Sequence, residues 1–225
     1  MNVPDSKIID LTRTLEDGQD GVAFDTAKIR DRDGWNARTL HLYSHSGTHL
    51  DAPLHFDRAG GKTIDQIPLD ACMGVAHVID LGGFPERALI RVEDLGRVAD
   101  EFKAGESLLL HTGWSRHFEE REYYRGNFPR ISDELATWCA DSGVKILGVE
   151  PPSVADVHNL DEVTRIHHIL LDAEVVIVEG LAHLNEINAD KVFFAALPLK
   201  IGGGDGTPCR AFAIEGELPP LTSMG

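Results

Sequence analysis

One eleven-residue segment, HSGTHLDAPLH, places three histidines and one aspartate at odd-numbered positions: His45, His49, Asp51 and His55. In an extended strand, alternate side chains share a face, so all four would point the same way. A helix would keep His45 and His49 together but turn Asp51 and His55 away, and the glycine, β-branched threonine and proline of the segment disfavour a helix. An extended or gently bent segment that presents three nitrogens and one oxygen to one point is typical of a metal site.

The alternative interpretation is a polar strand edge with solvated histidines. One or two histidines would favour that alternative, whereas four aligned donors favour a metal. Thr48 is expected to orient a ligand through its hydroxyl, and Ser46 should face the opposite side of the strand. The three cysteines are isolated and form no CxxC pair. The site must therefore use His, Asp and Glu, a donor set that selects Zn, Mn or Fe rather than a thiolate zinc finger.

The composition predicts a globular protein with its own core. The 225 residues are 42% hydrophobic and 26% charged, which suits one domain spanning residues 1–225. A net charge of −16 argues against nucleic acid or an anionic membrane as a partner. No apolar run approaches the roughly 20 residues of a membrane span. No secretory signal is visible, and isolated cysteines suit a reducing compartment, so a cytoplasmic location is expected.

The elements that must position these residues form a mixed α/β pattern. Short apolar runs predict strands at 8–11, 40–43, 75–81, 107–111, 146–149, 175–178, 193–197 and 211–214. Helices are predicted at 92–103, 133–140 and 161–171, the last two after the caps Ser132 and Asn159. Strands and helices interleave, but their spacing alone does not give the strand order.

Three other segments leave alternatives open. Residues 17–36 are polar and glycine-containing, and predict a loop or hairpin that leads into the metal strand. Residues 117–128, HFEEREYYRGNF, could form a lid, a subunit contact or an ordinary solvated loop. The glycine cluster 202–206 lacks the lysine and spacing of a phosphate loop, which favours a tight loop before the last strand. Trp35 and Trp114 either line an aryl pocket or pack.

A second pair of candidate donors lies far along the chain. His167 falls in the third predicted helix, and Glu179 ends the apolar strand 175–178. A strand end fixes the position of a carboxylate while the following loop gives access to it. The alternatives are a partly buried helix histidine and a surface carboxylate. Taken alone, these two residues favour the alternatives.

Several segments together resemble one known family. HSGTHLDAPLHF resembles the HxGTHxDxPxHF signature of the cyclase-like metal-dependent hydrolases, which include bacterial kynurenine formamidase and isatin hydrolase. The segment RIHH, followed by VEG, is similar to the family's second metal segment, a histidine with a glutamate twelve residues later. GVEPPSV and LPLKIGGGDGTPCRA are similar to two further family segments. The resemblance runs from about residue 40 to residue 215.

The resemblance implies roles for individual residues. His55 matches the family's catalytic acid/base, so it is no longer expected to be a fourth ligand. Asp51 would bridge two ions, and the implied cofactors are divalent metals, Zn or Mn, two per subunit. The implied metal ligands are His45, His49, Asp51, His167 and Glu179. The implied fold is the swivelling β/β/α type with a mixed sheet, and the implied assembly is a homodimer or larger homo-oligomer.

Such a site predicts hydrolysis of a small-molecule amide. A metal lowers the pKa of bound water towards about 7, so a metal-bound hydroxide is available at neutral pH. The ions also polarise the carbonyl, and His55 would deliver a proton to the leaving nitrogen. The expected reaction is C–N cleavage of an amide, formamide or cyclic amide, as by an arylformamidase, without a covalent enzyme intermediate.

Departures from the formamidase pattern leave the substrate open. Glu150 stands where formamidases carry aspartate, Pro152 stands where they carry threonine, and segment 10–13 lacks their tryptophan. These differences weaken an assignment to N-formylkynurenine. The alternatives are an isatin-hydrolase-type enzyme acting on a cyclic imide, lactam or lactone, and a non-hydrolytic cyclase or metal-binding protein on the same scaffold.

Overall fold

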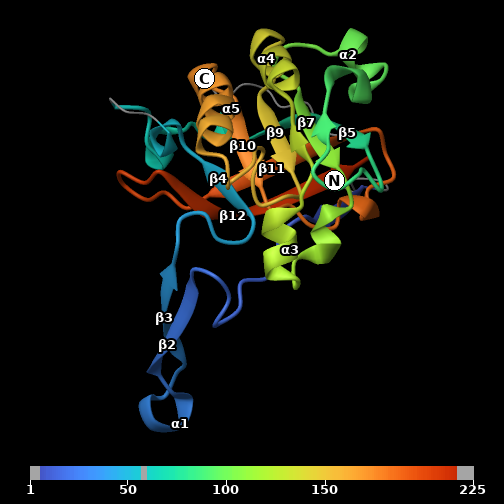
Figure 1. Ribbon diagram of the computed structural model, residues 1–225. Helices are drawn as coiled ribbons and strands as arrows, with labels where there is room; N and C mark the ends of the chain where they lie inside the picture. Colours follow the sequence, from blue (N-terminus) through green and yellow to red (C-terminus); the bar gives the residue numbers. More distant parts are fainter. Residues whose placement is uncertain (1–5, 57–59, 217–225) are drawn as a thin grey trace.

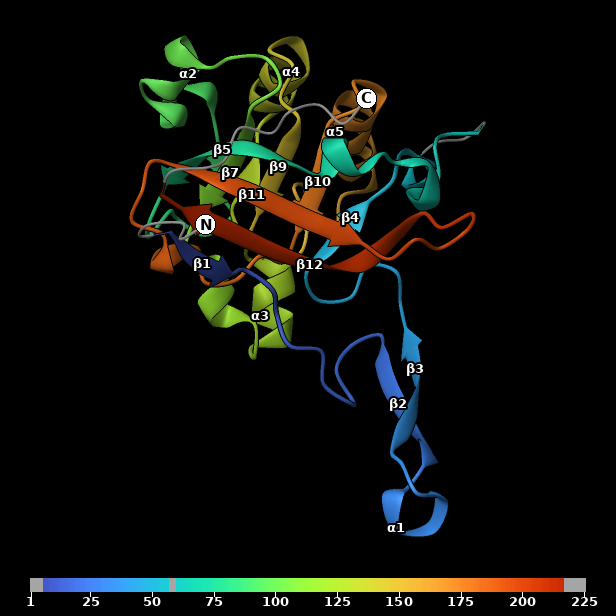
Figure 2. The ribbon, with the colours of Figure 1, turned by 180° about the vertical axis from the view of Figure 1, so that it is seen from behind.

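An eight-stranded mixed sheet that closes on itself forms the centre of the computed structural model, which describes residues 6–56 and 60–216. Its order is β1-β12-β11-β5-β7-β9-β10-β4, and β4 also pairs with β12, which makes a barrel (Figures 1 and 2). Strands β5, β7, β9 and β10 run parallel, and the other pairings are antiparallel. The strands are β1 Lys7–Asp10, β4 His49–Asp51, β5 Met73–Asp80, β7 Ser107–His111, β9 Ile146–Val149, β10 Val176–Glu179, β11 Lys191–Pro198 and β12 Gly206–Glu215.

The central strands are apolar throughout because both of their faces are covered. Leu109, Ile146 and Val178 belong to the core cluster inside the barrel. The opposite face packs against α4 (Asp133–Asp141) and α5 (Leu160–Asp172), as Figure 1 shows. Helix α4 begins at the predicted residue and α5 begins one residue before it, directly after the predicted caps: the side chains of Ser132 and Asn159 accept hydrogen bonds from backbone amides of the first turn.

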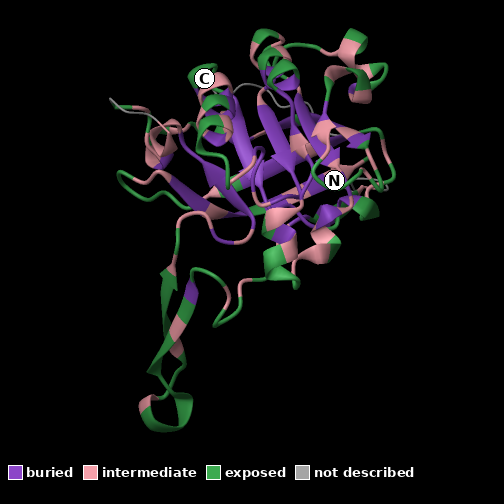
Figure 3. Ribbon diagram, in the orientation of Figure 1, coloured by how far each residue is buried: buried purple, intermediate pink, exposed green. Residues whose placement is uncertain are grey.

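A hairpin arm projects from the barrel. It consists of β2 (Val22–Lys28), β3 (Ala37–Leu42) and the short helix α1 (Arg30–Asp33) at its tip (Figures 1 and 2). The hairpin interpretation of 17–36 is therefore confirmed. Most of the arm is exposed (Figure 3), including the side chains of Trp35, Leu40 and Tyr43. Within residues 6–56 and 60–216, no helix is long and apolar enough to cross a membrane.

Two predicted segments differ from the structure. The helix predicted at 92–103 is divided into a 3-10 turn, Val92–Leu95, and α2, Val98–Glu101. Gly96 lies between them at φ 55°, a left-handed conformation that interrupts the helix. Segment 117–128 contains a helix, α3 (Arg121–Gly126), after the 3-10 turn Trp114–His117.

The remaining elements are short. Strands β6 (Leu89–Ile90) and β8 (Arg130–Ile131) pair in parallel beside the main sheet. Further 3-10 turns are Pro53–His55, Ile64–Gln66, Leu69–Cys72 and Leu184–Glu186. Cys72, Cys139 and Cys209 are buried free thiols, as their isolation in the sequence predicts.

Glu106 connects two strands and makes the fold sensitive to acid. Burial alone would raise its pKa, but hydrogen bonds from His77 (2.8 Å) and Lys191 (2.9 Å) outweigh burial and lower the pKa from 4.5 to about 2. Because the folded pKa is the lower one, this stabilisation is present above pH 4.5 and is lost as the pH falls towards 2. We expect Glu106→Gln to remove about 1–3 kcal/mol of unfolding free energy at pH 7 and little near pH 2.

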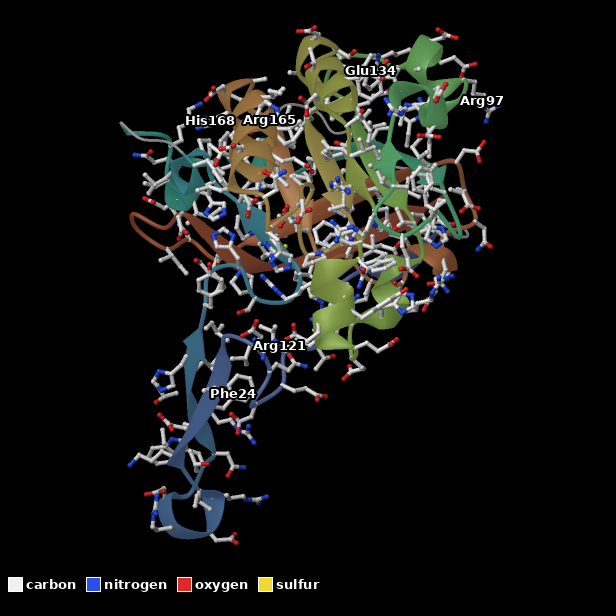
Figure 4. All side chains as sticks on the ribbon, in the orientation of Figure 1. Phe24, Arg97, Arg121, Glu134, Arg165 and His168 are labelled. Carbon is white, nitrogen blue, oxygen red and sulfur yellow. The ribbon has the colours of Figure 1, made fainter. Side chains whose placement is uncertain are left out.

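The measurement is urea unfolding of both proteins between pH 7 and pH 3. Glu134→Gln, an exposed change on α4 (Figure 4), is the matched control and should leave the pH profile unchanged. An identical acid dependence of Glu106→Gln and the wild type would contradict the account.

Candidate active site

The four residues of the HSGTHLDAPLH segment converge, but not along one strand. Only His49 and Asp51 lie in β4 and follow strand alternation. His45 lies in the turn before β4, where Gly47 adopts φ 63°, and His55 ends the 3-10 turn that begins at Pro53. The prediction that alternation aligns all four was therefore wrong for His45 and His55, because backbone turns bring them to the cluster.

The barrel closure at β4 brings the distant donors to the same place. In the β4–β10 pairing Glu179 lies opposite His49, and their side chains approach to 3.3 Å. His167, on α5, places Nε2 3.6 Å from Glu179 Oε1 and 3.7 Å from Asp51 Oδ2. Gly180 is required beside them, since a Cβ there would lie 2.3 Å from the Gly47 carbonyl oxygen.

Backbone contacts fix the orientation of two histidine rings. His49 Nδ1 lies 3.0 Å from the carbonyl oxygen of Gly47, and His167 Nδ1 lies 2.7 Å from that of Val163. A carbonyl only accepts, so each Nδ1 carries hydrogen and, in the neutral ring, each Nε2 keeps its lone pair. Both Nε2 atoms face carboxylates. This arrangement of a histidine held through its other nitrogen is the usual one in metal sites.

The carboxylate between these rings is incompletely satisfied. Asp51 is 1% exposed, and its Oδ2 has no hydrogen-bond partner among the described residues. Burying such an atom without a partner is costly, and its neighbour within 3.7 Å is His167 Nε2. A divalent cation would satisfy the oxygen and both lone pairs, so the residues fit the metal that the sequence predicts.

A second group of donors shares Asp51. His45, Asp51 and His55 offer ligand atoms within 4.8 Å of one another, as do His49, Asp51 and Glu179. The rings of His45 and His55 stack with centroids 3.8 Å apart. Asp51 thus stands between two donor groups, the position that a bridging ligand would need.

Asp205 also belongs to this cluster, although its sequence pattern predicts only a tight loop. Its Oδ2 lies 2.9 Å from His45 Nε2 and 3.6 Å from His55 Nδ1. The backbone explains its position, because Ala52 N donates to the Asp205 carbonyl and Gly206 pairs with Asp51. A carboxylate within a glycine-rich segment next to a strand was the signal available in the sequence.

The carboxylates attract protons to the histidines. Burial would lower the pKa of His45, but Asp51 and Asp205 outweigh it and raise the pKa to about 9. Burial would also lower the pKa values of His49 and His167, but the neighbouring carboxylates outweigh burial and raise both pKa values. For His55 burial dominates and lowers the pKa. A field that holds protons in this way also favours a divalent cation in their place.

Thr48 supports the cluster through the backbone rather than through a ligand. Its hydroxyl donates to the Gly180 carbonyl at 2.7 Å and accepts from Arg13 N at 2.9 Å. The expected contact with a ligand side chain is absent among the described residues. The hydroxyl instead joins the turn before β4 to the residue that follows Glu179.

A cavity of about 550 Å³ opens beside His45 and His49. Segments 18–21, 43–49 and 117–128 all contribute to its wall, the last with aromatic and charged side chains. The lining residues include Tyr43, Phe118, Glu119, Arg121, Tyr124 and Arg125. The segment therefore lies next to the donor cluster, where a lid would lie, although a subunit contact is equally compatible with this position.

A set of hydrogen bonds centred on Glu150 holds segment 117–128 in place, although Glu150 Oε1 itself has no hydrogen-bond partner among the described residues. The fully buried Glu150 accepts through Oε2 from Thr112 Oγ1 (3.0 Å) and from the backbone amides of Gly113 and Trp114. The Trp114 indole donates to the Tyr124 carbonyl, and the Tyr124 hydroxyl donates to the Glu150 carbonyl. Trp114, 2% exposed, thus packs and does not line the cavity, and Trp35 lies on the exposed arm.

We expect Glu150→Gln to loosen the wall without touching the donor cluster. Neutral hydrogen bonds replace charge-assisted ones, so unfolding free energy should fall by about 1–2 kcal/mol and KM should rise more than kcat falls. Metal content should not change. Glu150→Asp, which keeps the charge, should lose less, and equal KM and stability in Glu150→Gln and the wild type would contradict the anchoring role.

Comparison with known proteins gives this architecture a family. The family model described as "Putative cyclase" matches residues 9–156, about two thirds of the chain. The "Kynurenine formamidase" of Salinibacter ruber (strain DSM 13855 / M31) is 36% identical over 189 residues, which is 84% of each chain. The chain belongs to the putative cyclase family. A "Kynurenine formamidase" of Geobacillus thermodenitrificans (strain NG80-2) is 32% identical over 78% of each chain.

Solved structures agree with the fold. The structure described as "The Structure Of Potential Metal-Dependent Hydrolase With Cyclase Activity" superposes with a TM-score of 0.75 at 25% identity, covering 95% of this chain and 100% of the other. "Isatin hydrolase A (IHA) from Ralstonia solanacearum" gives a TM-score of 0.80 at 24% identity over 93% and 92%. The expected membership of the cyclase-like hydrolases and the mixed-sheet swivelling β/β/α fold are confirmed.

Proposed function

We propose that this member of the family is a metal-dependent hydrolase that cleaves the C–N bond of an amide, formamide or cyclic amide. The proposed metal ligands are His45, His49, Asp51, His167 and Glu179, which would hold two divalent ions, Zn or Mn. The observation that carries the proposal is the buried Asp51 carboxylate between the rings of His49 and His167. Its Oδ2 has no hydrogen-bond partner among the described residues, and the Nδ1 atom of each ring donates to a backbone carbonyl. The names of the relatives support amide chemistry.

His55 is the proposed acid/base. When bound, the ions would supply Lewis-acid activation of water and of the substrate carbonyl. Water adds to the carbonyl carbon, and His55 accepts one of its protons at the imidazole. His55 then donates that proton to the amide nitrogen as the C–N bond breaks, so the products are a carboxylic acid and an amine. The His55 side chain is 25% exposed, which leaves it accessible to substrate, whereas the proposed ligand His49 is buried.

We also propose that residues 1–225 act as one domain, that the protein is cytoplasmic and that it forms a homodimer or larger homo-oligomer. The arm supports the assembly, because Trp35, Leu40 and Tyr43 are each 57–60% exposed on a hairpin that projects from the barrel. Light scattering of the native protein measures the mass directly, and a monomeric mass would contradict the oligomer.

A substrate panel tests the activity. Chelated protein is reloaded with Zn or Mn and given simple formamides, anilides, cyclic imides and lactones. The proposal predicts release of amine from formamides or other amides in the loaded protein only. Cleavage of lactones without any amide would replace it with the lactone-hydrolase alternative, and no hydrolysis across the panel would contradict it.

A further inference from the structure

Arg13 lies between the turn that precedes β4 and the aromatic part of the cavity wall. Its backbone amide donates to the Thr48 hydroxyl at 2.9 Å, and that hydroxyl donates to the carbonyl of Gly180, the residue after Glu179. The side chain extends the other way, and its Nη2 donates to the Ser115 carbonyl at 2.8 Å. One residue therefore joins the backbone around the donor cluster to the segment that leads into the wall.

The guanidinium of Arg13 lies on two aromatic side chains of that wall. Its Cζ is 4.0 Å from the ring centroid of Phe118 and 5.3 Å from that of Tyr124. Its Nε is buried and has no hydrogen-bond partner among the described residues, so aromatic rings border part of the charge. A cation over an aromatic ring is attracted to the ring, and the attraction grows where water is excluded. Arg13 therefore stabilises the position of both rings by charge as well as by packing.

Phe118 depends on this contact because two cavities border its ring. It is half-buried and lines both the cavity beside the donor cluster and a second cavity of about 600 Å³. Arg13 is among the described residues that line the second cavity and not among those that line the first, so the Phe118 ring lies between Arg13 and the first cavity.

The other contacts of Phe118 hold it less closely. Its backbone amide donates to the Ser115 carbonyl at 3.4 Å, the same oxygen that accepts from Arg13. The ring meets Tyr124 at 79°, with centroids 5.5 Å apart. A side chain beside open space has few partners to fix its rotamer, so the guanidinium at 4.0 Å is the contact that decides where this ring lies.

We propose that Arg13 is a positioning residue, which holds the Phe118 ring beside the donor cluster so that the ring can contact the substrate. This inference rests on the proposed hydrolysis at the same site. Arg13 would act through Phe118 and touch neither the substrate nor the proposed metal ligands. Because its backbone amide also bonds to Thr48, Arg13 would set the spacing between this ring and the donor cluster.

Two formamides measure the contact with the Phe118 ring. N-benzylformamide and N-butylformamide have the same reacting group and release primary amines of similar basicity, but only the first has a ring that can stack on Phe118. In the metal-loaded wild type, kcat/KM should favour N-benzylformamide by about three- to tenfold, mainly through KM, the range expected of one aromatic pair. Phe118→Leu should lower that preference to about twofold or less. Equal kcat/KM for both compounds in the wild type would overturn the inference.

Variants of Arg13 test whether it acts through that ring. Arg13→Met should lower the preference as far as Phe118→Leu does, through a higher KM for N-benzylformamide, whereas Arg13→Lys keeps a cation near the ring and should retain an intermediate preference. The double variant Arg13→Met/Phe118→Leu should lose no more than Phe118→Leu alone, because residues that share one contact are not additive. Additive losses, or an undiminished preference in Arg13→Met, would overturn the inference.

Unfolding and metal analysis separate positioning from a general loss of structure. Metal content should match the wild type in both Arg13 variants, and the preference should follow the cation rather than the free energy of unfolding in urea. Equal losses of preference in Arg13→Lys and Arg13→Met, in proportion to their losses of stability, would overturn the positioning role.

Arg97→Met is the matched control. It removes the same charge from an arginine beside α2 that lies far from Arg121 in Figure 4 and pairs with Asp190. It should keep the full preference, and loss of preference in this variant as well would assign the effect to net charge and overturn the role of Arg13.

Direct binding separates this inference from the proposed activity. If the wild type hydrolyses both formamides without a preference, the activity stands and the inference falls. If it hydrolyses neither, calorimetry of the metal-loaded protein with benzylamine and butylamine decides. Tighter binding of benzylamine that Arg13→Met and Phe118→Leu each reduce would support the positioning role. Equal binding of the two amines, or a difference that Arg13→Met leaves intact, would overturn it.

Discussion

His55→Ala should lower kcat for amide hydrolysis by about 10²–10⁴-fold while the bound metal stays in place. The reason is the position of the side chain. It stacks on His45 and its Nδ1 lies 3.6 Å from Asp205, but it is 25% exposed, whereas the side chains of His45, His49 and His167 are 9%, 4% and 2% exposed. Metal analysis of the purified variant accompanies the kinetics.

Substrates with different leaving groups provide a second test of proton delivery by His55. An anilide with an electron-poor amine needs less protonation, so His55→Ala should lose less activity with a nitroanilide than with an alkyl amide. His41→Ala, on the exposed hairpin, is the control and should be fully active. Loss of the metal from His55→Ala would instead make His55 a ligand, and equal losses for both leaving groups would contradict proton delivery.

Asp51→Asn should abolish both metal binding and turnover. Asp51 belongs to both donor groups, and its Oδ2 has no other partner in the described residues. Removing its charge should lower the affinity for each ion by about a hundredfold or more. This loss exceeds the one caused by removing a residue that only orients a ligand. Calorimetric titration of metal into the chelated protein measures this change.

Thermal unfolding provides a readout without activity. A metal that binds only the folded state adds about 2.7 kcal/mol at a hundred times its Kd, so the wild-type midpoint should rise on addition of metal. Asp51→Asn should show no such rise. Asp172→Asn, exposed on the helix that carries His167, should behave as the wild type. Two ions bound with wild-type affinity by Asp51→Asn would remove Asp51 from the site.

The sequence predicts the regular elements well because their causes are local. The strands at 107–111 and 146–149 match β7 and β9, and caps at Ser132 and Asn159 start α4 and α5. Burial on both faces explains the apolar runs, and side-chain capping explains the helix starts. Helix 92–103 fails because Gly96, at φ 55°, interrupts a pattern that is otherwise helical.

The donor cluster depends on contacts that no local pattern contains. Glu179 meets His49 only because β4 closes the barrel against β10, and strand order cannot be derived from spacing. Asp205 reaches His45 because β12 pairs with β4, so its place in the glycine-rich loop alone does not predict this contact. The turn at Gly47 brings in His45, where simple alternation gave the right cluster for an incorrect reason.

A two-metal site predicts that the reaction depends on added metal. Turnover of a simple formamide should be followed while Zn or Mn is returned in increments to chelated wild-type protein. We predict negligible turnover without metal, a rise with added ion and saturation at about two ions per chain. Full turnover in the chelated protein, or no amide hydrolysis once two ions are bound, would contradict a two-metal amide hydrolase.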